Sequence, residues 1–361
     1  MEKTPLYNWH ISNKGRIVDF AGWALPVSYL SIIDEHTWTR ENASVFDICH
    51  MGQIFVKGRD SAKSLNALLT NDVSSMRKGQ CRYSFMLNDS GTIIDDLIVY
   101  RFDDYFMIVV NAARKDIDFE WISGHTPSGT YVSDESARIA KIDLQGPKAS
   151  LAAKEALGIG LSGLKYYHFW EMEFADIPLV ISRTGYTGEL GYEFYCEADK
   201  ALELWERFLS VDFVRPAGLG ARDSLRLEMG YPLYGQDISD SVTPIEAGLD
   251  RFIDLDKDFL GKEKMLEKAN LAKRMLTGIV GATRRPFRHN DKVVGQDGCE
   301  IGIVTSGGYS PSLGVAIGLA YVNKGVNSNQ DVFVRNGKGS LMKASIAQYP
   351  FYKDGTVRVS V

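Results

Sequence analysis

Two adjacent aspartates, Asp95 and Asp96, stand inside the apolar run IIDDLIVY at residues 93–100. Neighbouring residues in a strand point to opposite faces, so only one of these carboxylates can enter a given cavity. A carboxylate in an apolar strand is costly unless it has a partner or a chemical task, such as acid–base catalysis or stabilisation of positive charge. The pair therefore indicates either an active site or an edge strand whose aspartates cap a neighbouring loop.

A third carboxylate, Glu193, follows the glycine-rich turn of GYTGELGYEFY at residues 185–195. Glutamate can form two parallel hydrogen bonds with an amidine-like edge of a ligand, such as N3 and the 2-amino group of a pterin. The plainer alternative is a tight turn followed by a strand that faces solvent.

Two arginines, Arg222 and Arg226, lie four residues apart in GARDSLRLE (220–228) and so share one face of a helix. Arginine binds carboxylates through paired hydrogen bonds, which suits an anionic ligand. The alternative is a salt bridge within the helix, to Asp223 or Glu228.

Other polar segments carry weaker signals. His50, in FDICHMG, is a candidate base, although a lone histidine is more often a structural hydrogen-bonding group. TSGGYSPSLG (305–314) predicts a long loop, which either binds a ligand or is only a turn. The six histidines are scattered, and phosphate-loop, dinucleotide, HExxH and GxSxG signatures are missing. We therefore expect no metal centre.

The elements that must position these residues do not alternate strictly, which predicts an α+β fold. Runs of β-branched and aromatic residues predict strands at 53–58, 93–102, 105–111, 138–144 and 179–184. The second and third of these form a predicted hairpin. Apolar spacing predicts helices at 60–70, 199–210 and 219–230, the first capped by Asp60 and the last ended by Gly230.

The sequence changes in character near residue 270, after a candidate helix and linker at 262–274. Beyond it come short strands and glycine-rich turns, and all six tryptophans lie at or before Trp205. We therefore expect two interleaved α+β subdomains in residues 1–270 and a separate, all-β domain in residues 271–361.

Composition and charge argue against some classes of function. A chain of 361 residues with a net charge of −5 and a pI near 5.8 gives no electrostatic reason to expect nucleic acid or an anionic membrane as partner. The apolar stretches are too short or too charged to span a bilayer, and the first residues do not resemble a secretory signal. Four dispersed cysteines favour a reduced, cytoplasmic location over a disulfide framework or a zinc site.

Taken together and in this order, these motifs resemble the aminomethyltransferase family, the T-proteins of the glycine cleavage system. The resemblance runs from about Thr4 to Phe351. It rests on the segments TPLY (4–7), DFAGWALPVSY (19–29), FDICHMG (46–52), the ND of LLTND (68–72), IIDDLIVY (93–100), VVNAA (109–113), LQGP (144–147), GYTGELGYE (185–193), GLGARDSLRLEMGYPLYGQD (218–237), TP and Glu (243–246) and TSGGYSPSLG (305–314).

The resemblance implies a three-domain cloverleaf around a central folate pocket, with a jelly-roll-like barrel as the C-terminal domain. It also implies a reaction in which an aminomethyl group, carried on the lipoyl arm of H-protein, gives its methylene to tetrahydrofolate. The products are 5,10-methylenetetrahydrofolate, ammonia and the dihydrolipoyl arm. Lipoylated H-protein is then the partner and tetrahydrofolate the co-substrate, with no metal.

Site residues follow from the same resemblance, position by position. Asp96 matches the aspartate placed near N5 and N10 of folate, where a carboxylate orients the folate and stabilises positive charge. Glu193 matches the pterin-edge carboxylate, Arg222 the arginine of the folate site, and Asn111 a supporting residue of the pocket. Weaker candidates for the pocket walls are Tyr83, Tyr186 and Tyr234.

Two segments depart from the family pattern. Residues 284–294 lack the expected basic-plus-Gly-Tyr segment, and the C-terminal end matches only through PFYK, so the folate-contacting tail residue is either Tyr352 or absent. Two related activities remain as alternatives. A folate-dependent demethylase of a small methyl donor would differ around the donor channel. A folate-binding protein of iron–sulfur maintenance would carry a cysteine near LYGQD (233–237), where this chain has none.

Overall fold

The computed structural model describes residues 1–359, and the chain divides into two compact units. The first unit comprises residues 1–84, 96–222 and the tail from residue 355. The second comprises residues 85–95 and 223–354. Strands and helices are mixed rather than strictly alternating, which confirms the α+β prediction. The predicted boundary at residue 270 remains a prediction, although the barrel described below begins close to it, at Arg274.

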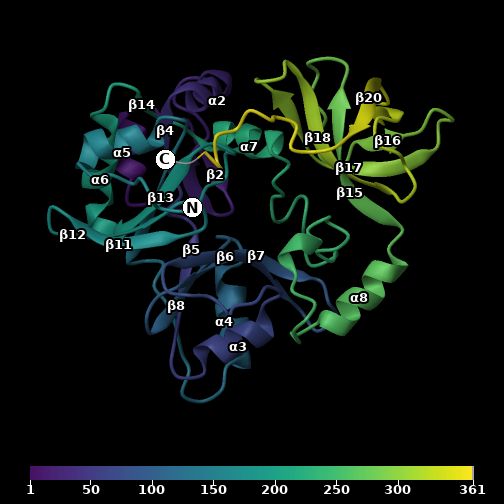
Figure 1. Ribbon diagram of the computed structural model, residues 1–361. Helices are drawn as coiled ribbons and strands as arrows, with labels where there is room; N and C mark the ends of the chain where they lie inside the picture. Colours follow the sequence, from purple (N-terminus) through teal and green to yellow (C-terminus); the bar gives the residue numbers. More distant parts are fainter. Residues whose placement is uncertain (360–361) are drawn as a thin grey trace. The chain divides into compact units, whose positions relative to one another are not determined.

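A six-stranded sheet organises much of the first unit (Figure 1). Its order is β11 (Phe169–Phe174), β12 (Ile177–Ser182), β13 (Gly191–Glu197), β10 (Ile139–Gln145), β4 (Ala43–Asp47) and β14 (Val214–Pro216). Helices α5 (Ala149–Leu157) and α6 (Ala201–Leu209) pack on β4, β10 and β13. The short helix η1 (Ala198–Lys200) leads into α6.

The sequence of β10 explains why this sheet has two unlike faces. Alternate residues point to opposite faces, so Ala140, Ile142 and Leu144 share one of them. All three belong to the hydrophobic core that also contains Phe194 and Trp205. The other face of the same strand carries a lysine, an aspartate and a glutamine, and it is the starting point of the candidate site.

A five-stranded sheet of order β6–β7–β8–β5–β9 also belongs largely to the first unit. Its strands are β6 (Gln80–Leu87), β7 (Ile93–Arg101), β8 (Tyr105–Val110), β5 (Gly52–Lys57) and β9 (Tyr131–Asp134). β7 and β8 pair antiparallel around Asp103 and Asp104, which confirms the predicted hairpin. Helix α3 (Ser61–Leu68) packs on β8, and α4 (Lys115–His125) packs on β9.

The remaining part of the first unit lies near the N-terminus. β1 (Glu2–Lys3), β3 (Trp23–Pro26) and β2 (Ile17–Phe20) form a three-stranded sheet. Helices α1 (Tyr7–Ser12) and α2 (Ile32–Glu41) complete it, and Ser31 caps α2 by accepting a hydrogen bond from the Asp34 amide. Asp60 stands at the N-cap position of α3, as predicted, but its side chain makes no capping hydrogen bond.

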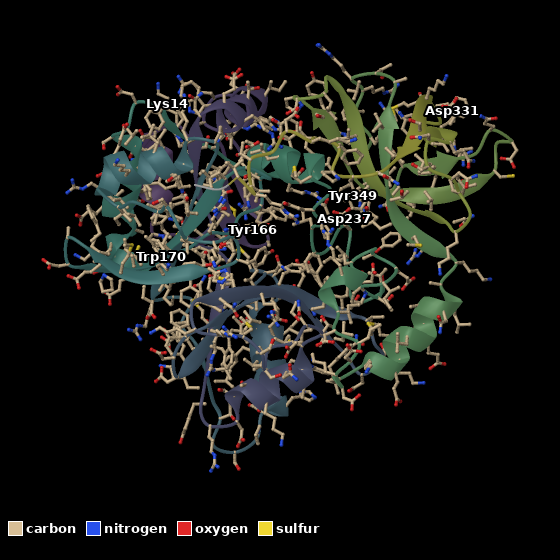
Figure 2. All side chains as sticks on the ribbon, viewed as in Figure 1. Lys14, Tyr166, Trp170, Asp237, Asp331 and Tyr349 are labelled. Carbon is tan, nitrogen blue, oxygen red and sulfur yellow. The ribbon has the colours of Figure 1, made fainter. Side chains whose placement is uncertain are left out.

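Helix α7 (Leu219–Glu228) starts in the first unit and continues into the second. Its predicted end at Gly230 is confirmed: this glycine has φ +68°, and the Tyr231 amide donates to Arg226 O. A Cβ at residue 230 would also lie about 2.5 Å from the ring of Tyr349, so only glycine fits. Tyr349 is labelled in Figure 2.

The second unit contains a closed barrel of order β15–β18–β17–β16–β19–β20, which confirms the predicted all-β character. Its strands are β15 (Arg274–Gly281), β16 (Lys292–Val294), β17 (Glu300–Ser310), β18 (Val315–Asn323), β19 (Asp331–Arg335) and β20 (Leu341–Ala347). The helices η2 (Asp250–Phe252) and α8 (Lys262–Leu271) precede it, the latter as predicted.

The predicted long loop at 305–314 is wrong, because β17 continues to Ser310 and only a short turn follows. Its glycines serve packing instead of flexibility. A Cβ at Gly307 would lie 2.6 Å from Phe287 O, so the strand passes close to another backbone. Within residues 1–359, no helix is long and apolar enough to cross a membrane.

Candidate active site

Asp96 lies on β7 and is held by two of the predicted site residues. Tyr83 Oη donates to Asp96 Oδ2 at 2.9 Å, and Asn111 Nδ2 donates to Asp96 Oδ1 at 2.8 Å. Burial raises the pKa of Asp96, and these two hydrogen bonds only partly oppose the rise. The structure thus brings Asp96, Tyr83 and Asn111 together.

Asp95, its neighbour, points to the opposite face of β7 and is fully buried. Its side chain is therefore withdrawn from solvent. Asp96 is the partly exposed member of the pair, so the strand alternation separates the two carboxylates as predicted.

A second group of polar residues occupies the polar face of the six-stranded sheet. In the pairing of β10 with β13, Asp143 lies opposite Glu193 and Lys141 opposite Tyr195. None of these four residues is more than 3% exposed. Charged groups so deeply buried are tolerated only when they are paired and hydrogen-bonded.

Glu193 is the centre of this group. Its Oε1 lies 3.0 Å from Lys141 Nζ, and its Oε2 accepts from Thr184 Oγ1 at 2.7 Å and from Tyr100 and Tyr195, each at 3.1 Å. Burial alone would raise the pKa of Glu193, but the charge of Lys141 and these hydrogen bonds outweigh it and hold the pKa below its ordinary value. The alternative of a solvent-facing strand at Glu193 is wrong.

Tyr100 connects the two carboxylates. It lies on β7 four residues beyond Asp96, so both side chains share one face of that strand. At about 3.3 Å per residue, the two Cα atoms are roughly 13 Å apart. Because the Tyr100 hydroxyl donates to Glu193, the carboxylates of Asp96 and Glu193 lie toward the same side of β7.

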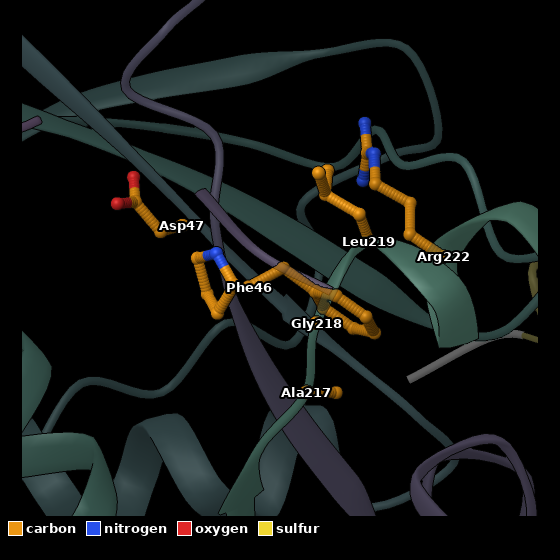
Figure 3. Close-up of a pocket in the computed structure, with 7 residues that line it drawn as sticks. Phe46, Asp47, Ala217, Gly218, Leu219 and Arg222 are labelled. Carbon is orange, nitrogen blue, oxygen red and sulfur yellow. The ribbon is translucent and has the colours of Figure 1, made fainter. Parts of the chain in front are cut away.

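Arg222, on α7, forms an ion pair with Asp143, and its guanidinium lies 5.0 Å from the centre of the Tyr186 ring. Burial raises the pKa of Asp143 to about 6, despite the opposing charge of Arg222. Arg222 also lines a pocket together with Phe46, Asp47, Pro26 and residues 217–219 (Figure 3). The structure thus brings Arg222 and Tyr186 together beside Glu193.

Arg226 forms the salt bridge within the helix that was the alternative to ligand binding. It bonds Asp223 at 2.8 Å within the helix and Asp237 at 2.7 Å, and its Nη2 donates to Ser306 Oγ at 2.9 Å. Asp237 is buried in the second unit (Figure 2). These contacts make Arg226 a structural residue of that unit.

Two further predicted residues belong to the second unit. Tyr234 donates its hydroxyl to Ile93 O at 3.4 Å, and the Tyr352 amide donates to Glu228 O at 3.0 Å. Their roles toward folate stay predictions.

The glycine-rich segment 184–191 enters β13 and is held on one side by Gln145. Gln145 Nε2 donates to Thr184 O at 3.2 Å, and Thr187 Oγ1 donates to Gln145 Oε1 at 2.8 Å. A Cβ at Gly185 or Gly191 would lie 2.2–2.6 Å from the Gln145 side chain, so both positions require glycine.

The C-terminal tail holds the same segment on its other side. The hydroxyl of Thr356 donates to Glu189, and the Leu190 amide donates to that hydroxyl at 2.8 Å. The Val357 amide donates to Gly188 O at 3.1 Å, and Arg183 donates to the carbonyls of Val357 and Val359. The turn that leads to Glu193 is therefore fixed by residues far away in sequence.

Sequence reasoning missed several members of the site, namely Tyr100, Lys141, Asp143, Gln145, Thr184, Tyr195 and Thr356. A usable signal existed for three of them. In IAKIDLQ, every second residue is polar within an apolar strand, which is the same anomaly that drew attention to Asp95 and Asp96. The described residues contain no cluster of histidine, cysteine or carboxylate groups suited to a metal ion.

Comparison with known proteins agrees with this geometry. A family model described as the GCVT N-terminal domain matches residues 6–257, and one described as the glycine cleavage T-protein C-terminal barrel domain matches residues 274–353. The chain is 40% identical to the aminomethyltransferase of Thermotoga maritima over 100% of both chains. It is 41% identical to that of Caldanaerobacter subterraneus, covering 98% of this chain and 96% of the relative.

A solved structure agrees as well. The glycine cleavage system aminomethyltransferase T from Bartonella henselae superposes with a TM-score of 0.92, at 33% identity, over 98% of this chain and 99% of that one. The chain therefore belongs to the aminomethyltransferase family, the T-proteins of glycine cleavage.

Proposed function

We propose that this enzyme is the aminomethyltransferase of a glycine cleavage system. It transfers the methylene of an aminomethyl group on lipoylated H-protein to tetrahydrofolate, releasing ammonia and the dihydrolipoyl arm. The observation that carries the proposal is the placement of Asp96 and Glu193 on one side of β7, each fixed by its own hydrogen bonds, in a chain of this family.

The residues present fit a folate. Glu193 stays charged, and its Oε1 accepts from Lys141 alone among the described residues, so it retains capacity for a donor on the pterin edge. Arg222 and the face of Tyr186 lie beside it and suit the carboxylate tail and the flat rings of the same ligand.

Asp96 is the carboxylate that acts where the methylene is transferred. Two C–N bonds to folate form while the C–S and C–N bonds of the aminomethyl group break, and the two folate N–H protons end on the thiol and the amine. A fixed carboxylate orients the folate nitrogens and stabilises the positive charge that develops as the methylene moves. Tyr83 and Asn111 hold this carboxylate in one orientation.

A cytoplasmic location belongs to the same proposal. All four cysteines are free thiols, three of them buried, which supports a reducing compartment.

An assay of methylenetetrahydrofolate formation tests the proposal directly. Purified chain is mixed with tetrahydrofolate and with H-protein whose lipoyl arm carries the aminomethyl group. We expect folate product and ammonia in equal amounts. Tetrahydrofolate binding without turnover would refute the proposed donor and favour the folate-dependent demethylase, whereas no folate binding would refute both.

A further inference from the structure

His50 lies in the turn between β4 and β5 and plays no part in the contacts described so far. It is only 7% exposed, and the edge of its ring meets Phe20 at 5.5 Å between ring centres. Nδ1 is buried without a hydrogen-bond partner, and no described residue hydrogen-bonds to Nε2. Buried polar groups without partners are rare, and each calls for an explanation.

The turn that carries His50 connects the two carboxylate clusters. On one side, the Ile48 amide donates to Lys141 O, and Lys141 Nζ lies 3.7 Å from Met51 Sδ. On the other side, Gly52 pairs with Val110, the residue just before Asn111. The turn that carries His50 therefore contacts Lys141 on one side and the strand that leads to Asn111 on the other.

The charged groups near His50 are engaged elsewhere. Asp47 accepts from His10 at 2.8 Å, from Thr4 and from the Cys49 amide, while Lys141 and Arg222 pair with Glu193 and Asp143. Burial, Arg222 and Lys141 lower the pKa of His50 to about 4, against the charge of Asp47. Near neutral pH the imidazole is therefore uncharged, with one N–H donor and one acceptor nitrogen to offer.

We propose that His50 is a further binding residue of this site, whose neutral imidazole hydrogen-bonds to the ring system of tetrahydrofolate between Glu193 and Asp96. This rests on the proposed function. A reduced pterin carries N–H donors and lone-pair acceptors along its edge, which match the imidazole. A protonated imidazole would offer two donors and would be repelled by the neighbouring cations.

Nitrogen NMR tests this inference on the wild-type protein, because tetrahydrofolate is titrated into the wild type itself. The chain is labelled with ¹⁵N-histidine, and the signals of His50 are assigned by their loss in His50→Gln. We expect tetrahydrofolate to shift the ring nitrogens of His50 while those of His125, whose ring bonds Trp121 O at 2.8 Å, stay in place. His50 signals unchanged at saturating tetrahydrofolate would overturn the inference.

Calorimetry provides a second measurement. We expect His50→Ala to raise the Kd for tetrahydrofolate by about 3- to 10-fold, the usual worth of one neutral hydrogen bond, with His125→Ala as the matched control. Wild-type affinity in a folded His50→Ala protein would also overturn the inference. If the wild-type protein turns over but its His50 signals do not respond to tetrahydrofolate, only this inference fails. If the wild-type protein does not bind folate, the proposed function fails.

Discussion

Lys141→Met is the most decisive perturbation of the site, because it breaks a buried ion pair without changing side-chain length much. Lys141 and Glu193 lie 3.0 Å apart with side chains 2% and 4% exposed, so solvent screens them little. Removing one member of such a pair costs about 3–5 kcal/mol. Glu193 retains three hydroxyl donors, which places the expected loss near 3 kcal/mol at pH 7.

Tryptophan fluorescence is suited to this measurement, because all six tryptophans belong to the first unit, which also contains Lys141. A unit of this size loses roughly 2–4 °C of Tm per kcal/mol, so we expect the Tm to fall by about 6–12 °C. Lys78→Met is the matched control. Lys78 also belongs to the first unit and pairs with Asp103, but its side chain is 54% exposed, so its loss should leave the Tm nearly unchanged.

The change of this Tm loss with pH tests its electrostatic cause. The lowered pKa of folded Glu193 means that its contribution to stability is present above the unfolded value of about 4.3 and is lost as the pH falls through the folded value. In Lys141→Met that stabilisation is gone, so the gap in Tm between variant and wild type should be full at pH 7 and should narrow only as the pH falls below about 4.3. An equal Tm loss in Lys78→Met, or a gap that widens on acidification, would refute the reasoning.

Three further predictions concern activity. Asp96→Asn should keep tetrahydrofolate affinity while kcat falls about 100-fold or more, measured with aminomethyl-loaded H-protein, and unchanged turnover would contradict its role. Glu193→Ala should raise the Kd for tetrahydrofolate by at least about 10-fold in calorimetry, because a charged hydrogen-bonding group is lost, and wild-type affinity would exclude it as the pterin contact. Thr356→Val should raise KM for tetrahydrofolate several-fold at near-constant kcat, because it frees the turn before Glu193; equal losses in both constants would indicate a general structural role.

The sequence predicts best those features that depend on near neighbours. Alternation of side chains identified the β7–β8 hairpin and separated Asp95 from Asp96, and glycine at position 230 ended α7. Each of these follows from a few adjacent residues and from backbone rules that hold in any fold.

Features that depend on distant pairing were not predictable in the same way. Lys141 meets Glu193 only because β10 and β13 pair in one register, and nothing local fixes that register. The tail contact of Thr356 with Glu189 spans 167 residues. The glycines at 307 and 308 led to a wrong loop prediction for the same reason. Gly307 lies in a strand, and the close approach of Phe287 accounts for a glycine there.

The two central carboxylates have opposite electrostatic surroundings, and this difference separates their tasks. Lys141 and a hydroxyl cluster hold the pKa of Glu193 low, so it presents a permanent negative charge to a ligand edge. Among the described residues, Asp96 accepts from the neutral side chains of Tyr83 and Asn111, and burial raises its pKa. When neighbouring acids are pushed in opposite directions, the one with the raised pKa is the group suited to follow charge and proton changes during a reaction. This difference supports the proposed division, in which Glu193 on β13 binds the ligand and Asp96 on β7 takes part in the chemistry.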